Sequence, residues 1–253
     1  MKPEAPHHHV KSHTPNSIRK RLQDEGRDGV YLKDFIYGAI DGAVTTFAVV
    51  SGVAGAELSS GVVIVLGLAN LVADGFSMAV SNFMGARAEQ QIRDKAKRTE
   101  LRHIEIFPEG EEEEIRQIFA MKGFEDPVLD SVVSVITADK NRWVETMLHE
   151  ELGLPDNPAS PWKAATTTFI AFLLIGVAPL GPFLLNWISP GSLASPFQWS
   201  VGLTSAAFFA VGAAKSRYVI QSWWSSGLET LAMGGVAAGL SYWIGWALKG
   251  LVE

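Results

Sequence analysis

Residues 61–84 read GVVIVLGLANLVADGFSMAVSNFM, and Asp74 is the only charged residue in this stretch. About 20 consecutive apolar residues are enough for a helix to cross the hydrocarbon core of a membrane. A carboxylate inside that core costs roughly 2.5–3.5 kcal/mol on insertion scales, so an ionisable residue there indicates a functional site. The stretch therefore predicts a membrane-spanning helix that carries a functional acidic group.

Four more apolar blocks occur elsewhere in the 253-residue chain, of which 47% is hydrophobic. We place them at about residues 35–58, 164–187, 197–214 and 228–248. Almost no Lys or Arg interrupts them, and each is close to the length that a membrane-spanning helix needs. The predicted fold class is therefore an all-α membrane protein with five transmembrane helices.

The flanks of these blocks predict four segments and an orientation. Residues 1–33 form an N-terminal tail, 34–84 carry transmembrane helices one and two, 85–160 form an acidic helical domain, and 161–253 carry helices three to five. Lys and Arg are frequent in the tail and number ten in residues 85–160, whereas the links after the first and third blocks have none. Because positive residues favour the cytosolic side, we expect the tail and the acidic domain to be cytosolic.

Polar side chains recur inside the first two blocks at positions that helices would bring together. Asn70, Asp74 and Met78 are spaced by four residues and so share one face of the second helix. Asp41, in the first helix, is expected at a depth similar to that of Met78, because the two helices run antiparallel. These groups could hydrogen-bond between helices and do nothing more. Two carboxylates without an intramembrane Lys or Arg nearby instead favour a path for a cation or a proton.

The acidic segment holds 17 Asp and Glu against ten Lys and Arg, and its apolar residues recur at helical spacing. We expect the second transmembrane helix to project from the membrane and three short helices to form a small subdomain. Each of three helices offers a short group of metal ligands: Glu100 with His103, Glu111 with Glu114, and Met147 with Glu150 and Glu151. Such groups on facing helices build metal sites in helical bundles, and this chemistry suits Fe(II), Mn(II) or Co(II).

Two simpler interpretations of these charges remain open. The acidic run 111–114 could be a solvated first turn, stabilised by the helix dipole by ~0.3–1 kcal/mol per residue. His7, His8, His9 and His13 could bind metal weakly, but we favour a terminus without such a role. The chain has no cysteine, which excludes thiolate metal sites and thiol catalysis.

Four stretches carry a resemblance to a known family. They read YGAIDGAVTTFAVVSGVAGA, ANLVADGFSMAVSNFMGARAE, NRWVETMLHEELGL and IGVAPLGPF, and they resemble the vacuolar iron transporter family. The resemblance runs in order from about residue 30 to 250. It implies a five-span homodimer with a transport path at the subunit interface, which moves Fe(II), and often Mn(II), out of the cytosol in exchange for protons.

The resemblance also implies roles for individual residues. Asp41 and Met78 match the intramembrane metal-handling pair of the family. The cytosolic ligands of the family match Glu100, Glu111, Glu114, Met147 and Glu151. Three positions depart from the family pattern: His103 stands where a glutamate is usual, Leu148 where a second methionine is common, and Asn70 where plant-like members carry a glutamate. We therefore expect Asp74 to be the proton-coupling carboxylate.

The function predicted from the sequence is proton-coupled export of Fe(II), and possibly Mn(II), from the cytosol. The alternative is a membrane-anchored sensor or store of divalent metal. We expect no enzyme activity, no prosthetic group and no nucleic-acid partner. No His or Cys lies in any span, which disfavours an intramembrane hydrolase. A nucleotide-binding GxxxxGK[ST] motif is absent, so the expected driving force is a proton gradient. The expected partners are divalent ions, the bilayer and a second copy of the chain. A bacterial inner membrane is favoured, or a vacuolar membrane in a eukaryote.

Overall fold

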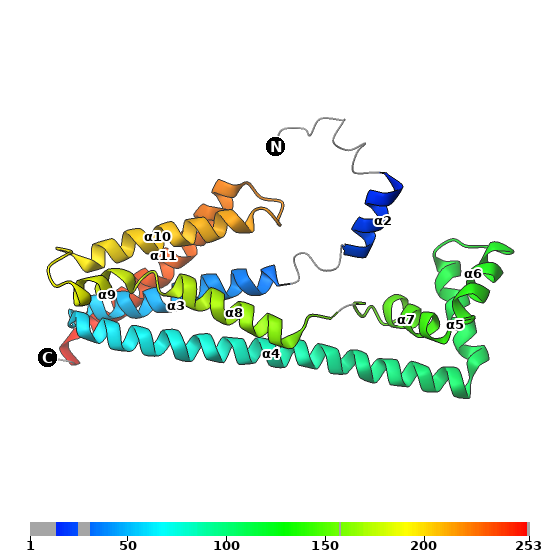
Figure 1. Ribbon diagram of the computed structural model, residues 1–253. Coiled ribbons are helices and arrows are strands. Elements are labelled where there is room, and N and C mark those ends of the chain that lie inside the picture. The colour runs from blue at the N-terminus through cyan, green and yellow to red at the C-terminus, as the bar shows by residue number, and fades with distance from the viewer. Residues whose placement is uncertain (1–13, 25–30, 157, 252–253) are drawn as a thin grey trace. The chain divides into compact units, whose positions relative to one another are not determined.

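A computed structural model describes residues 14–24, 31–156 and 158–251 of the chain, and all regular elements in these ranges are helices (Figure 1). The all-helical fold class is thus confirmed. The predicted tail is described only from residue 14, where a helix, α2 (Pro15–Asp24), begins; the four tail histidines lie outside the described residues. The chain divides into two compact units: residues 1–83 with 161–253, and residues 84–160. We refer to them as the bundle and the acidic unit.

Besides α2, the described part of the bundle has six helical pieces. They are α3 (Leu32–Gly55), the first part of α4 (Ser60–Ile106), α8 (Pro161–Gly176), α9 (Gly181–Ile188), α10 (Pro196–Lys215) and α11 (Trp223–Ala247), followed by a short 3-10 turn at Lys249–Leu251. Helix α3 packs against α8, α10 and α11 (Figure 1). Its buried Phe47 and Val50 contribute to a core that also holds Phe172, Leu180 and Phe208.

Helix lengths and hydropathy bear directly on the number of membrane spans. In the part of the chain that the structure describes, α3, α4 and α10 are long and apolar enough to cross a membrane. Helices α8 and α9 add a fourth crossing if the pair, which bends by 61° in the Pro179–Pro182 region, counts as one span. Helix α11 has 25 residues but is not among these candidates, since Ser, Gly and Trp lower its hydropathy. Five spans therefore remain a prediction.

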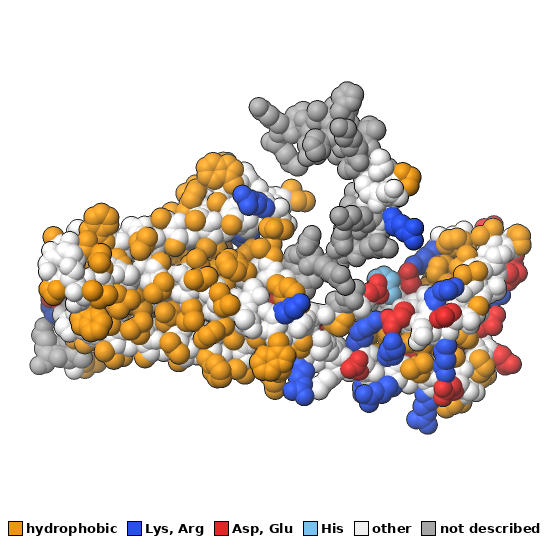
Figure 2. All heavy atoms as spheres, in the orientation of Figure 1, with side chains coloured by type: hydrophobic (Ala, Val, Ile, Leu, Met, Phe, Trp, Pro, Cys, Tyr) orange, Lys and Arg blue, Asp and Glu red, His pale blue; other side chains and the backbone are white. Residues whose placement is uncertain are grey.

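Small residues let the bundle helices approach closely. A Cβ atom on Gly38 or Gly42 of α3 would overlap the backbone of α8 at Thr168 or Phe172, and one on Gly245 of α11 would overlap the carbonyl oxygen of Gly52. Such backbone contact is typical of membrane helices, because small residues bring the helix axes together. The outer surface of the bundle is apolar, as the face in Figure 2 shows, and exposed tryptophans lie near several helix ends.

The acidic unit contains the rest of α4 together with α5 (Pro108–Met121), α6 (Val128–Thr137) and α7 (Lys140–Glu150). Pro108 stands in the first turn of α5, and the side chain of Asp139 accepts a hydrogen bond from the Arg142 N–H at 2.9 Å to cap α7. These signals place the helix starts where the chain must turn. The unit has its own core of buried apolar side chains: Ile104, Ile115, Leu129, Val133, Ile136, Trp143, Val144, Met147 and Leu148.

The close contact between α3 and α11 predicts a position-specific effect. Gly245→Ala places a methyl group against the Gly52 carbonyl, so the backbones must separate, at a cost of about 1–3 kcal/mol. We expect the variant to unfold at a lower temperature in detergent, as measured by circular dichroism. Gly202→Ala on α10, where nothing lies within 4 Å of the added atom, is the control and should unfold at or above the wild-type temperature. Equal midpoints for both variants would contradict the packing described.

Candidate metal centre

The unbroken course of α4 brings the first pair of candidate ligands to the start of α5. Glu100 and His103 lie three residues apart and so share one side of α4, near its end at Ile106. The chain then turns at Phe107, and α5 begins at Pro108, which places Glu111 and Glu114 in its first two turns. Short loop length thus brings an acidic helix start against the end of another helix.

Three side chains converge there at metal-binding distance. One carboxylate oxygen from each of Glu100 and Glu111 and one ring nitrogen of His103 all lie within 4.8 Å of one another. His103 Nδ1 is 3.3 Å from Glu111 Oε1. Carboxylate oxygens and an imidazole nitrogen bind a first-row divalent ion at roughly 2.0–2.2 Å, so a single ion between them could reach all three groups.

The two carboxylates of this cluster are buried, whereas the imidazole is open. Glu100 and Glu111 are 6% and 5% exposed, and the side chain of His103 is 53% exposed. Glu111 Oε2 is buried without a hydrogen-bond partner in the part of the chain described. A buried carboxylate without a partner is costly, so this atom marks the place where a cation would be stabilising.

The electrostatic environment of these carboxylates also indicates a cation site at the cluster. Burial, followed by the nearby carboxylates of Glu114 and Glu100, raises the pKa of Glu111 to about 7. Burial also raises the pKa of Glu100, with Glu114 adding to it, and that of Glu151, with Glu100 and Glu114 adding to it. Like charges held together disfavour ionisation unless a cation neutralises them. Glu114 and Glu151, whose side chains are exposed, are thus close enough to Glu100 to interact with it electrostatically.

Helix α7 and the residue after it carry the remaining predicted ligands, whose surroundings differ. Met147 is fully buried in the core that includes Ile104 and Ile115, each four residues beyond a cluster carboxylate. Glu151, just past the helix end, interacts with the cluster. Glu150 instead forms an ion pair with Lys122, so it does not join the cluster in this structure.

The predicted intramembrane residues lie on adjacent helices of the bundle. Asp41 on α3 and Asp74 on α4 are close enough for their carboxylates to repel each other, and both are half-buried, as is Met78. Within the described residues, neither carboxylate forms an ion pair. The Thr45 hydroxyl donates a hydrogen bond to the backbone carbonyl oxygen of Asp41 at 2.9 Å, one turn earlier on the same helix.

One further polar group on α4, Asn82, was not predicted. Asn82 donates hydrogen bonds to Asp34 Oδ1 at 2.9 Å and to Thr168 Oγ1 at 2.8 Å, and so joins α3, α4 and α8. These three residues line a pocket of about 300 Å³ together with Met78 and others. The signal was present in the sequence, because Asn82 continues the four-residue spacing of Asn70, Asp74 and Met78.

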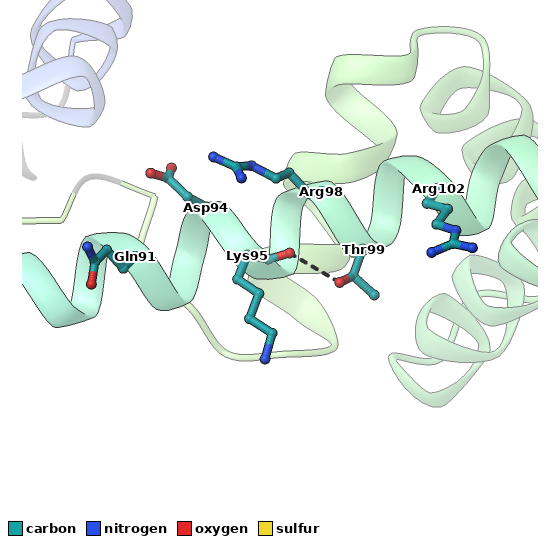
Figure 3. A pocket seen from close by; sticks show the side chains of 6 residues that line it. All are labelled: Gln91, Asp94, Lys95, Arg98, Thr99 and Arg102. Atoms are coloured by element: carbon teal, nitrogen blue, oxygen red, sulfur yellow. Dashed lines mark hydrogen bonds between the residues drawn. The ribbon is translucent and has the colours of Figure 1, made fainter.

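A further pocket, of about 560 Å³, lies on another face of α4 and is less suited to a metal ion (Figure 3). Its lining includes three cations, Lys95, Arg98 and Arg102, with Thr99 bonded to the Lys95 carbonyl at 3.1 Å. Positive side chains repel a divalent cation. The carboxylate cluster is therefore the stronger candidate within the acidic unit.

Comparison with known proteins identifies the family of the chain. Residues 32–246 match the VIT family. The chain belongs to this family. The resemblance noted in the sequence is thus confirmed, and the match together with the apolar helices makes the chain an integral membrane protein.

Several VIT-family relatives align over most of their length. The vacuolar iron transporter of Toxoplasma gondii is 33% identical over 227 residues, which cover 87% of this chain and 74% of the relative. Vacuolar iron transporter 1 of Arabidopsis thaliana is 30% identical over 216 residues, covering 85% and 84% of the two chains. The vacuolar iron transporter of Plasmodium falciparum is 28% identical over 240 residues, covering 92% and 88%.

The raised pKa of Glu111 predicts that the metal-free acidic unit loses stability as the pH rises. Between its ordinary pKa of 4.5 and about 7, the folded carboxyl holds a proton that the unfolded chain has released. Its contribution to folding is therefore present at low pH and is lost as the pH rises through the folded pKa. Glu111→Gln, which stays uncharged, should stabilise the metal-free unit near pH 8 by roughly 2–4 kcal/mol and change little near pH 4.

Hydrogen exchange of the α5 and α7 amides in the chelator-treated full chain measures this difference. Glu112→Gln is the control, because Glu112 is exposed on the same helix. If Glu111→Gln and wild type are equally protected near pH 8, burial does not raise the pKa as described.

Proposed function

We propose that this VIT-family chain transports Fe(II), and also Mn(II), out of the cytosol in exchange for protons. The observation that carries the proposal is the pair Asp41 and Asp74, two carboxylates on adjacent bundle helices that form no ion pair among the described residues. Charged groups at membrane depth must protonate or meet a cation, and doing both in turn couples the two fluxes. The relatives named as vacuolar iron transporters support iron as the cargo.

The carboxylate cluster of the acidic unit supports a role in collecting metal. The cluster offers one carboxylate oxygen from each of Glu100 and Glu111 and one ring nitrogen of His103. Met147 on α7 and Glu151 just after it are further candidate ligands. We propose that this cluster binds the ion before transport. Its oxygen-rich chemistry suits Fe(II) and Mn(II), and the exposed imidazole leaves the ion an open route to and from water.

The direction of transport rests on the charges that flank the helices. Lys and Arg concentrate in the tail and in residues 85–160, which we place in the cytosol together with the metal-collecting cluster. A proton gradient is the proposed driving force, and Asp74 the proposed proton carrier. The chain has no role as an enzyme in this proposal, and no prosthetic group is needed. A bacterial inner membrane, or a vacuolar membrane in a eukaryote, would supply such a gradient.

Surface properties of the bundle support a five-span homodimer. Only 28% of the most apolar stretch of α4 is buried within the chain, against 56% for α3, although α4 carries Asp74 and Met78. Gly235 and Gly239 on α11 have nothing within 4 Å of the position of an added Cβ atom, so their small surfaces are free for another helix. We propose that α11 spans the membrane as the fifth helix and that a second copy covers α4.

A membrane-anchored metal sensor or store is the alternative, because the acidic unit alone could bind metal. An anchor does not need carboxylates at membrane depth. In liposomes with an imposed pH gradient, a transporter should accumulate Fe(II) or Mn(II), whereas a sensor should not.

Asp41→Ala tests the proposed path directly. We expect the wild-type chain to take up Mn(II) into liposomes when the pH gradient is imposed, and the variant to take up none above empty liposomes, because the path loses a carboxylate. Uptake is measured with an entrapped metal-sensitive dye, first with Mn(II) and Fe(II) and then with a panel of divalent ions. Glu57→Ala, which removes an exposed carboxylate at the other end of α3, is the control. Uptake by Asp41→Ala at the wild-type rate contradicts the proposal, and an inactive wild type favours the sensor.

A matched pair of variants separates a metal site from a solvated acidic run. Glu111→Gln with Glu114→Gln should weaken Mn(II) binding to the detergent-solubilised full chain by at least about tenfold, as measured by electron paramagnetic resonance of free Mn(II). Glu112→Gln with Glu113→Gln removes the same charge from the same turn, where both side chains are exposed, and should leave affinity within about twofold. Equal losses would mean that the run acts only through its total charge.

A further inference from the structure

Helix α7 carries the candidate ligand Met147 and is followed directly by Glu151. The contacts that hold α7 against α4 therefore also determine where these two candidate ligands lie. Met147 lies on α7 and Glu151 follows its last residue, while Glu100 and His103 come from α4. The two helices are separated in sequence by α5 and α6. Their alignment must therefore come from contacts between side chains.

Three charged residues make such a contact. Glu145 of α7 accepts from Arg93 through Oε2 and from Lys97 Nζ through Oε1, the latter at 2.7 Å. Both carboxylate oxygens are thus used, each by a different cation of α4. We refer to Arg93, Lys97 and Glu145 as the clamp.

The clamp is more buried than the other ion pair between these helices. The side chain of Arg93 is 12% exposed, and those of Lys97 and Glu145 are each 39% exposed. The second terminal nitrogen of Arg93 is buried without a partner among the described residues. Lys140 and Glu105 also join α7 to α4, but their side chains are 45% and 67% exposed. Exposed pairs contribute little. The guanidinium of Arg93, in contrast, is largely buried and would lose its compensating charge if Glu145 moved away, so this contact constrains the position of α7 more firmly.

Helical spacing connects the clamp to the ligands. On α4, Arg93 is seven residues and Lys97 three residues before Glu100, so all three share one face. On α7, Glu145 is two residues before Met147 and six before Glu151. Along α4, the clamp residues Arg93 and Lys97 come before Glu100 and His103, and Glu105, which pairs with Lys140 of α7, comes after them. Contacts with α7 therefore lie on both sides of the α4 ligands, so the position of α7 is fixed along the stretch that carries them.

We propose that the clamp is a positioning device for the metal site: it sets α7 against α4 and so holds Met147 and Glu151 at the Glu100, His103 and Glu111 cluster. The inference rests on the proposed metal-collecting function of the acidic unit. None of the three clamp residues is proposed to contact the ion. They act through the placement of residues that do, as supporting groups around metal sites commonly do.

The sign of one effect separates positioning from simple electrostatics. Arg93 and Lys97 are cations near a site for a cation, so removing their charge should strengthen binding if only long-range attraction and repulsion matter. Positioning predicts the opposite, because α7 loses its alignment. We expect Arg93→Gln with Lys97→Gln to weaken Mn(II) binding to the full chain in detergent by about tenfold.

Lys95 and Arg98 provide a matched control on the same helix. They point to the pocket of Figure 3 and form no ion pair among the described residues. Lys95→Gln with Arg98→Gln removes the same charge from the same part of α4, and Mn(II) should bind as tightly as in wild type or more tightly. If the clamp variant binds as tightly as this control, positioning is wrong.

A charge exchange distinguishes positioning from loss of fold. Arg93→Glu alone sets two carboxylates against each other and Glu145→Arg alone sets three cations together, so each should weaken binding. The double variant restores an attractive pair and should recover most of the wild-type affinity, a coupling that independent damage would not produce. If wild type itself binds no Mn(II) or Fe(II), the proposed function fails; if wild type binds but the double variant does not recover, only the clamp is overturned.

Discussion

Acidic side chains held away from Lys and Arg are the constraint on which this structure depends. In the acidic unit, Glu100 and Glu111 are buried side by side, and Glu111 Oε2 has no partner among the described residues. In the bundle, the carboxylates of Asp41 and Asp74 lie on adjacent helices, close enough to repel each other. Each arrangement is unfavourable for an ionised carboxylate and becomes favourable when a proton or a metal ion is present. The same arrangement in both units supports the proposal that the chain handles a mobile cation.

Local sequence signals fix where the helices that carry these acidic side chains begin. Pro108 starts α5 immediately after α4, and Asp139 caps α7, so both ligand-bearing helices begin at defined positions. A small apolar core beneath the cluster, with Val133 and Leu148 among its members, then carries the packing energy. In the bundle, small residues such as Gly38 and Gly42 bring α3 against α8.

Periodicity accounts for what could be predicted from the sequence, and side-chain pairing for what could not. The apolar blocks and the spacing of Asp74 with Met78 were readable because a helix repeats every 3.6 residues. Burial of Glu111 but not of Glu112 or Glu113 depends on how α5 rotates against α4, which the acidic run itself does not encode. Glu150 was grouped with the ligands by proximity in sequence, yet Lys122, 28 residues away, pairs with it. Asn82 has the right spacing, but its partners Asp34 and Thr168 lie 48 and 86 residues away, so its role depends on packing that the spacing does not encode.

The chemistry of the cluster also bears on how an ion would leave it. A cysteine-rich site would hold a soft metal tightly, but this chain has no cysteine and offers oxygens with one imidazole. His103 is open to solvent while Glu100 and Glu111 are not, so one side of the site can exchange a ligand for water. A half-open site binds an ion less permanently than a closed one, as the contrast between closed structural and open catalytic zinc sites illustrates. A site that passes its ion on must release the ion readily, whereas a storage site functions better when it holds the ion tightly. The exposure of His103 therefore favours transfer over storage.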